Sequence, residues 1–314
     1  MHRHTVLRSA FALFAMAFLT AAQAQLFRAY LASDGADVNP CTLAQPCRLL
    51  PSALAAVADG GEIWMLDSAN YNTATVNVTK SVTLLAIPGA VGSLVATAGP
   101  AISINTAGVN VTLRNLVMVP GPAGGATTGV QMLGGNSLIV DSCLVANMPI
   151  AGINANVASA KVQVIDSVFR GNLNGLAFGS GVIASVSNTK VLGSTSVGVN
   201  ASGTVASVIS TVTISDSIVA GSAGPGVYAE VIAANSGINL MVTRSTIANN
   251  TNGIVSIGTM GVTNVVVSGS TISGNSGIGL AQSGGGAILS SLGNNTVRLN
   301  GTPTSGTITT IALQ

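Results

Sequence analysis

The sequence has 314 residues, of which 48% are hydrophobic and only 6% are charged, with 11 basic and 9 acidic side chains. Such a chain, without a basic stripe interleaved with aromatic residues, lacks the electrostatic surface that nucleic acids and anionic membranes attract. These numbers argue against a nucleic-acid-binding protein, and the length is sufficient for one large domain.

The first 24 residues have the features of a secretory signal peptide. A basic start is followed by an apolar stretch, 9–19, that is too short to span a bilayer, and then by a small-x-small sequence at 22–24. We expect cleavage after Ala24 and export; retention as a permanent anchor is the alternative. Both histidines and two basic residues lie in this segment, so the mature chain has no histidine and no net charge.

The next segment, 25–61, is expected to form an N-terminal cap. In an oxidising compartment the spacing NPCTLAQPC predicts a small loop closed by a Cys41–Cys47 disulfide, and no nearby ligands favour a zinc site instead. The sequence RLLPSALAAVA, 48–58, predicts a short capping helix with proline in its first turn.

From residue 62 onward the chain is rich in Gly, Asn, Ser and branched aliphatic residues, which is typical of β-strands separated by many turns. Strands are expected at 62–66, 74–78 and 82–86, and a last strand at 306–313. No apolar run after residue 24 reaches the roughly 18 residues that a membrane span needs.

A phrase similar to STIxGNxxGI recurs seven times at spacings of 22 to 28 residues. Periods of this length are typical of solenoids. The phrase is centred on Asn115, Asp141, Asp166, Asn188, Asp216, Arg244 and Gly269.

Two positions of the repeat are always apolar, which predicts two short strands that each point one face inward. Two residues before the centre stand Leu113, Ile139, Val164, Val186, Ile214, Val242 and Val267. Three residues after it stand Met118, Leu144, Phe169, Val191, Val219, Ile247 and Ile272. A third strand is expected to open at Gly129, Gly152, Gly175, Gly198, Gly226, Gly253 and Gly277.

The corner between the second and third strands carries Asn or Gly. We expect Asn147, Asn172, Asn250 and Asn275 to form one column of hydrogen-bonding side chains. One coil cannot bury its inward face alone, but a stack of coils forms a continuous aliphatic core. The sequence therefore predicts an all-β protein, a right-handed parallel β-helix with three strands per coil over 62–314.

The coils 109–301, together with the NPC…PCR loop and the phrase KSVTL at 80–84, resemble the pectin lyase-like superfamily. They are most similar to exported bacterial β-helix repeat proteins of unknown role. The resemblance implies this fold and a secreted, periplasmic or cell-surface location. It also raises polysaccharide lyase activity, because the superfamily includes enzymes that act on acidic polysaccharides.

Only the lyase branch suits a mature chain without histidine. Such lyases use aspartates that bind Ca²⁺ and an Arg or Lys that removes a proton beside a uronate carboxylate. The candidate catalytic residues are therefore Asp141, Asp166, Arg170 and Lys190, with Asp141 and Asp166 also the candidate metal ligands, in adjacent coils. The alternative interpretation of the Asp/Asn column is structural, as corner residues that satisfy backbone donors.

Other polar and aromatic residues receive structural interpretations. We expect a surface ion pair between Asp216 and Arg244, and an outward-facing, packed, unreactive Cys143. Trp64 and Tyr71 are expected to fill core rather than to stack on a sugar.

The remaining acidic residues are scattered over loops and caps, where turn formation is favoured over a cation site: Asp34, Asp37, Asp59 and Asp67.

Two longer excursions, 119–128 and 222–237, are expected to interrupt the coils. Leu138, Val140 and Ile165 are predicted to face outward beneath the first one and to form an apolar groove.

The leading functional hypothesis is an exported, non-catalytic module that binds a polysaccharide or a protein partner and needs no cofactor. A polysaccharide lyase that uses Ca²⁺ and acts on pectate or alginate is the alternative, and an adhesin passenger domain is a third. The oligomeric state is left open.

Overall fold

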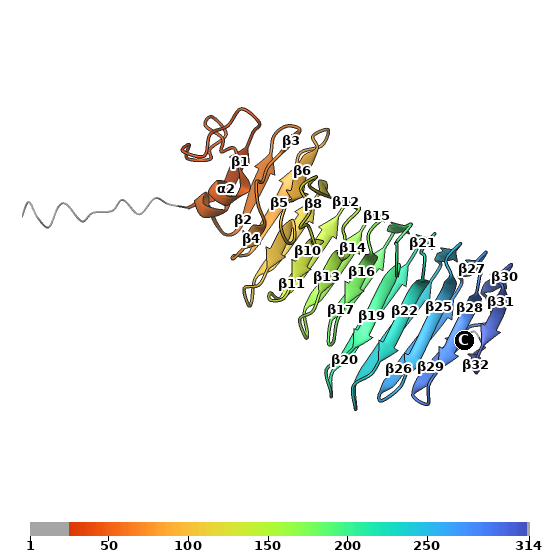
Figure 1. Cartoon of the computed structure of the whole chain (residues 1–314). Helices are drawn as coiled ribbons and strands as arrows, with labels where there is room; N and C mark the ends of the chain where they lie inside the picture. Colours follow the sequence, from red (N-terminus) through yellow and green to blue (C-terminus); the bar gives the residue numbers. More distant parts are fainter. Residues whose placement is uncertain (1–24, 313–314) are drawn as a thin grey trace, which may run out of the picture.

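The computed structural model describes residues 25–312, which form a stack of parallel coils (Figure 1). The strands lie in three sheets of 12, 10 and 10 strands, and neighbouring strands in each sheet are parallel. Among the described residues there is a single helix, α2 (Leu50–Ala56), which is not long enough to cross a membrane. The predicted all-β parallel solenoid is confirmed. The predicted signal peptide, 1–24, lies outside the described residues.

Successive coils supply the neighbouring strands of each sheet. Sheet A contains β1 (Leu26–Leu31), β2 (Val57–Met65), β5 (Val82–Ala86), β8 (Asn110–Arg114), β11 (Ser137–Asp141), β14 (Lys161–Ile165), β17 (Ile183–Ser187), β20 (Ile209–Ser215), β23 (Gly237–Thr243), β26 (Val262–Ser268), β29 (Ala287–Ser291) and β32 (Ile308–Thr310). Sheet B contains β3 (Ala69–Asn70), β6 (Gly92–Ala96), β9 (Leu116–Pro120), β12 (Leu144–Ala146), β15 (Val168–Arg170), β18 (Lys190–Leu192), β21 (Ile218–Ala220), β24 (Thr246–Ala248), β27 (Thr271–Ser273) and β30 (Thr296–Arg298). Sheet C contains β4 (Val76–Val78), β7 (Ile102–Ile104), β10 (Thr128–Met132), β13 (Ala151–Ala155), β16 (Asn174–Phe178), β19 (Val199–Gly203), β22 (Pro225–Val231), β25 (Asn252–Gly258), β28 (Ile278–Ser283) and β31 (Thr302–Ser305).

The core is the predicted aliphatic column, with one correction. Leu113 and Val164 are fully buried, but the residue paired with both of them is Val140, and Ile139 lies on the outer face. The second coil is therefore shifted by one residue from the predicted alignment. Three consecutive apolar residues, 138–140, allow either face of the strand to turn inward, so alternation alone does not determine the register.

The same shift changes the second inward column and the outer face. Val145, and not Leu144, is the buried residue that pairs with Phe169. Leu138 and Val140 are buried, so the apolar groove predicted from them is wrong.

The corner between sheets A and B contains one residue in the left-handed region, a conformation that Asn, Asp and Gly tolerate best. Its φ angles of 43–56° belong to Asn115, Ser142, Asp166, Asn188, Asp216, Arg244 and Gly269. Ser142 therefore occupies the corner of the second coil, and the prediction that Asp141 does so is wrong.

In five coils the residue after the corner carries a buried hydroxyl that links successive coils, whereas Leu116 and Cys143 take this position after Asn115 and Ser142. In one example Ser217 donates to the Ser215 carbonyl at 2.7 Å and accepts from the Thr189 backbone N–H at 3.1 Å. The hydroxyls that repeat this position belong to Ser167, Thr189, Ser217, Ser245 and Ser270.

The predicted asparagine column is present at the corner between sheets B and C. Asn250 and Asn275 are buried, and Asn275 Oδ1 accepts from the Asn250 backbone N–H at 3.0 Å and from its Nδ2 at 3.1 Å. Asn300 continues the column in the next coil. Asn147 does not belong to it, because it occupies the preceding, positive-φ position that is otherwise taken by residues such as Gly171.

Sheet C opens with a column of glycines that lets backbone pass close to backbone. An ideal Cβ on Gly198 would lie 2.4 Å from Val219 Cγ1 and 2.5 Å from the Gly226 carbonyl oxygen, so no larger residue fits. In the last member of the column the predicted Gly277 is wrong: Gly279 faces Gly253, since Ile254 pairs with Leu280.

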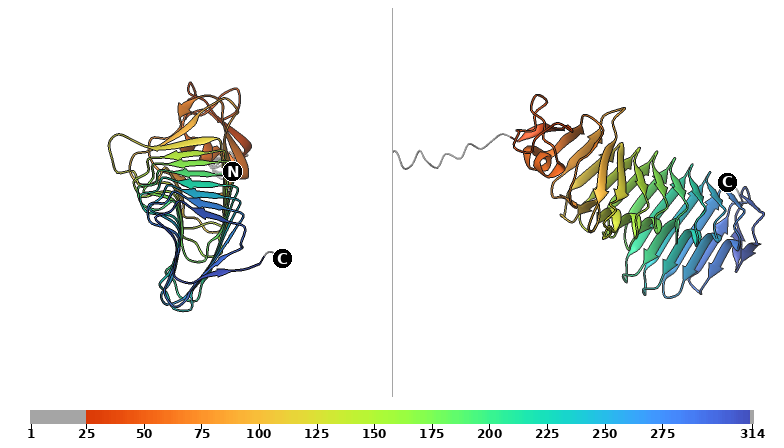
Figure 2. Two further views of the ribbon diagram at one scale, coloured as in Figure 1. Left: turned by 90° about the vertical axis from the view of Figure 1, so that its right-hand side faces the viewer. Right: turned by 45° about the horizontal axis from the view of Figure 1, so that its top comes forward.

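The N-terminal end of the stack is covered by α2, which buries Leu50, Ala53 and Leu54 (Figures 1 and 2). The helix is shorter than predicted. β1 precedes it and pairs with β2 in sheet A, so the β-helix already begins within the segment 25–61 that the sequence assigns to the cap.

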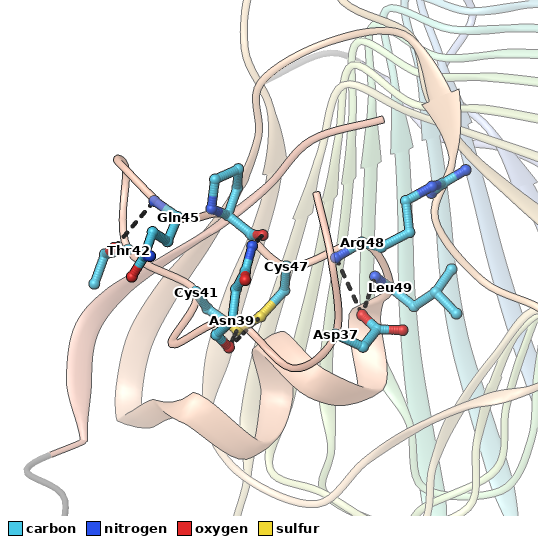
Figure 3. The surroundings of a disulfide bond; sticks show 9 residues. Asp37, Asn39, Cys41, Thr42, Gln45, Cys47, Arg48 and Leu49 are labelled. Carbon is cyan, nitrogen blue, oxygen red and sulfur yellow. Dashed lines mark hydrogen bonds between the residues drawn. A yellow bond between two sulfur atoms is a disulfide. The ribbon is translucent and has the colours of Figure 1, made fainter. Parts of the chain in front are cut away.

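The Cys41–Cys47 disulfide closes the predicted loop beside α2 (Figure 3). Asp37 joins this loop to the helix, because its Oδ1 accepts from the backbone N–H groups of Arg48 and Leu49 at 3.1 and 2.8 Å.

Of the two predicted excursions, only the first is a loop, between β9 and β10. The second contains the seven-residue strand β22 between two turns. β20, β23, β25 and β26 share this length, so the later coils are wider (Figure 2). The tail pairs in sheet A as β32, as expected; its predicted last residue, 313, lies outside the described part.

Candidate functional site

The predicted aspartate pair is not assembled as the spacing suggested. Asp141 ends β11 on the outer side of sheet A, where its register partner in the next coil is Ile165. Its carboxylate accepts from Arg114 Nε and from the Ser142 hydroxyl, both at 2.8 Å. Asp166 stands at the exposed corner, and its carboxylate accepts from the Asn188 side chain. Each carboxylate is thus engaged by a different protein donor.

The two candidate bases lie on the outer side of sheet B. Arg170 ends β15 and Lys190 begins β18 in the next coil; both are exposed and neither forms an ion pair within residues 25–312. In that part of the chain no group of three or more His, Cys, Asp or Glu side chains could hold a metal ion. Ca²⁺ binding by Asp141 and Asp166 stays a prediction, as do the catalytic roles of all four residues.

The predicted surface ion pair is confirmed. Arg244 Nε and Nη2 donate to the two carboxylate oxygens of Asp216 at 2.8 and 2.7 Å. This hydrogen bonding lowers the pKa of Asp216, but both side chains are largely exposed, so the pair is weakly stabilising.

Cys143 was expected to face outward, and the one-residue shift makes it buried instead. It occupies the position of Ser167 and Thr189 in the hydroxyl column, where its thiol lies 3.3 Å from the Asp141 carbonyl oxygen. Burial raises the pKa of Cys143 to about 12. A thiol that stays protonated is a poor nucleophile, which agrees with the predicted structural role.

The two aromatic candidates lie in different environments. Tyr71 is fully buried as predicted, and its hydroxyl donates to Asp67. Trp64 does not fill the core: it is half-buried on the outer face of sheet A, where the Arg28 guanidinium covers its ring at 4.0 Å and Glu62 accepts from its indole N–H at 3.0 Å. Because a charged side chain already occupies its ring face, Trp64 does not offer a free stacking surface.

Three of the four acidic residues assigned to loops and caps, Asp37, Asp59 and Asp67, have structural partners; Asp59 lies in β2, and no hydrogen bond of the Asp34 side chain is seen among the described residues. Asp59 Oδ1 accepts from the Ser81 backbone N–H at 2.7 Å, and Asp37 anchors α2 as described above. Desolvation opposes ionisation of Asp67, but hydrogen bonds from Ser33 and Tyr71 outweigh it and lower the pKa of this carboxyl. These contacts favour the predicted turn-forming roles.

A polar hollow that no sequence pattern predicted lies on the outer face of sheet C and has a volume of about 240 Å³. Its polar side chains come from three successive coils and carry no charge: Asn154, Asn156, Asn174, Asn200, Ser202 and Thr204. No pattern within one repeat indicates this site, because the asparagines that form it occur in only some of the coils.

The hollow forms because small residues lie between larger ones. Ala177 in β16 pairs with Asn154 on one side and with Asn200 on the other. Gly179, directly after β16, also lines the hollow, as do Asn156 and Ser202. The middle coil thus provides the floor, and the amide and hydroxyl groups of its neighbours provide the walls.

One acceptor in the hollow is without a partner. Asn200 Oδ1 is shielded from solvent and accepts no hydrogen bond from any described residue. Three other buried hydroxyls, those of Thr128, Ser194 and Ser222, also lack a partner among the described residues, but of the four groups only Asn200 lines the hollow, where a ligand or water can supply a donor.

A tyrosine continues the same face in the next coil. Tyr228 pairs with Asn200 in register and is half-buried. Burial raises the pKa of Tyr228 to about 12, and the neighbouring Glu230 carboxylate adds to the shift. The phenol therefore remains neutral, and its hydroxyl is a hydrogen-bond donor beside Glu230.

No protein-family model matches the sequence, and no curated protein matches it significantly. Solved structures are similar in fold. The structure of XylC in complex with xylose matches with a TM-score of 0.56 at 9% identity, over 86% of this chain and 70% of that one. The chain has the right-handed parallel β-helix fold.

Two further structures are similar at lower scores. Pectate lyase Pel9A matches at 15% identity with a TM-score of 0.48, over 89% of this chain and 72% of that one. The A-module of mannuronan C-5 epimerase AlgE4 from Azotobacter vinelandii matches at 14% identity with a TM-score of 0.36, over 81% and 90%. Identities this low speak to fold and assign no activity.

Proposed function

We propose that the protein is an exported, non-catalytic module that binds a polysaccharide through the outer face of sheet C. The observation that carries the proposal is the unpaired, shielded Asn200 Oδ1 in a hollow lined by amides and hydroxyls. Such groups donate to and accept from sugar hydroxyls without any need for a charged partner. Ligand sites of this kind are concave, with a few convergent polar groups.

The rigidity of the stack supports a binding role. The walls of the hollow belong to strands that pair in register with both neighbouring coils, so little freedom is lost on binding. The Cys41–Cys47 disulfide and the features of residues 1–24 support export to an oxidising compartment. XylC, which shares the fold, was solved with a neutral sugar, xylose.

The lyase alternative has less support. It needs Asp141 and Asp166 free to share a cation, and these carboxylates are engaged by Arg114 and by Asn188. A protein partner is the other alternative, and the adhesin hypothesis has no observation in its favour.

The proposal is tested by electrophoresis of the purified chain in native gels that contain a dissolved polysaccharide. We expect retardation in at least one gel relative to a gel without polysaccharide, and weaker retardation for Asn200→Ala. Unchanged mobility in every gel, with a folded protein, would contradict the proposal.

A further inference from the structure

Sheet C differs from sheets A and B because its strands contain almost no charged residues. Its ten strands contain no Lys or Arg, and their only acidic residue is Glu230. The other charged residues within strands lie in sheets A and B: Arg28, Asp59, Glu62, Arg114, Asp141, Lys161, Arg170, Lys190 and Arg298. A ligand on sheet C therefore meets no cation from the strands of that sheet.

An anionic glycan would be poorly matched to this surface. Carboxylates on a polysaccharide are recognised by Arg or Lys, which form charge-assisted hydrogen bonds with them. Desolvating a carboxylate against neutral amides leaves its charge uncompensated, and Glu230, which pairs in register with Ser202 at the edge of the hollow, would repel it.

A neutral glycan can supply the hydrogen-bond partners that the side chains of the hollow lack. Sugar hydroxyls can accept from the side-chain amides of Asn154 and Asn156, and one can donate to the unpaired Asn200 Oδ1 when the Asn200 side chain turns it toward the hollow. Asn154 and Asn200 are two coils apart, which places them about 10 Å apart along the stack. They can therefore contact one extended chain that runs across the strands.

We infer that the polysaccharide bound by sheet C is neutral, and that Asn154, Asn200 and the floor residue Ala177 are the residues that select it. This inference rests on the proposed function and narrows it to one ligand class. It departs from the acidic polysaccharides suggested by the resemblance to pectin lyase-like proteins.

The test compares two neutral polymers, arabinoxylan and hydroxyethyl cellulose, with two acidic ones, polygalacturonate and alginate, in the native-gel assay. We expect retardation in at least one neutral gel and none in the acidic gels. Retardation in the acidic gels alone would overturn the inference while leaving the proposed function intact. Retardation in none of the four would overturn the proposed function itself.

Three variants locate the site. Ala177→Leu fills the floor, and Ala281→Leu is its matched control, because Ala281 lies in the same outward column of sheet C outside the hollow. We expect about tenfold weaker binding for Ala177→Leu and for Asn200→Ala, and unchanged binding for Ala281→Leu. Equal effects of the two leucine variants would overturn the assignment to the hollow, provided that circular dichroism shows each variant folded.

Discussion

Columns of polar side chains occur at the inner corners of the coil and on the outer face of sheet C, and the two differ in what satisfies them. At the corners the asparagine side chains are paired with the neighbouring coil, as in the contacts between Asn250 and Asn275, whereas the Ser194 and Ser222 hydroxyls at the same position have no partner among the described residues. On sheet C, Asn200 Oδ1 has no partner among the described residues.

The difference separates structural polar residues from functional ones. Buried hydrogen bonds between coils hold the stack in register, so the corner columns contribute to stability. Amides that face outward over small residues contribute little to the stack and are free to contact a ligand. A repeated polar residue in a solenoid is therefore not evidence of a site until its partners are known.

The largest expected effect comes from the asparagine column. Asn275→Ala leaves the Asn250 backbone N–H and the Ile247 carbonyl without their side-chain partners, in a buried corner. We expect a loss of about 2 to 4 kcal/mol in the free energy of unfolding. Denaturant unfolding measures it, with Asn154→Ala, on the outer face, as the control that changes stability by less than about 0.5 kcal/mol. Equal losses in both would remove the distinction between the two columns.

A smaller loss of stability is expected from a substitution in the glycine column at the start of sheet C. Gly198→Ala brings a methyl group into contact with Val219 and with the Gly226 carbonyl oxygen, which forces the coils apart. Overpacking of this kind costs about 1 to 3 kcal/mol. Gly285→Ala is the control, because nothing lies within 4 Å of its ideal Cβ. Matching melting temperatures for the two variants would show that the glycine column is not required for close packing.

The exposed ion pair at the corner, Asp216 and Arg244, is expected to make a small contribution to the stability of the fold that depends on pH. The hydrogen bond from Arg244 lowers the pKa of Asp216 below its ordinary value of 3.8. The carboxylate therefore stabilises the fold above that value, and the contribution is lost as the pH falls through the lower, folded pKa. The melting temperature should fall less steeply between about pH 5 and pH 2 for Asp216→Asn than for the wild type. An unchanged slope would mean that the pair contributes nothing.

The smallest effect is expected at Asp166. Asp166→Asn should change the free energy of unfolding by less than about 0.5 kcal/mol, since the side chain is exposed. Incubation with polygalacturonate or alginate and Ca²⁺ should yield no ultraviolet-absorbing unsaturated product from the wild type or the variant. Product from the wild type that disappears in Asp166→Asn, but not in the corner variant Asp216→Asn, would support the lyase alternative and contradict ours.

The predictions from sequence succeeded where the residues of a single strand alternate clearly between apolar and polar. Leu113 and Val164 are apolar residues between polar neighbours or within a clear alternation, and they are buried as expected. The second coil failed because 138–140 are all apolar, and with that register Asp141, Leu144, Cys143 and Asn147 were all misplaced by one position. Gly277 failed for a similar reason, because two glycines two residues apart fit the same pattern.

The sequence by itself determined the repeating coil, its aliphatic core, the asparagine corner and the closed loop at Cys41 and Cys47, because each depends on short-range spacing. The tertiary structure alone decided which side chains of different coils become neighbours. Asn154, Ala177 and Asn200 are 23 residues apart in each step, and only the hydrogen-bonded register between coils brings them together. Since coils of unequal length are aligned by backbone pairing and not by residue count, a site built across coils is not visible in one repeat.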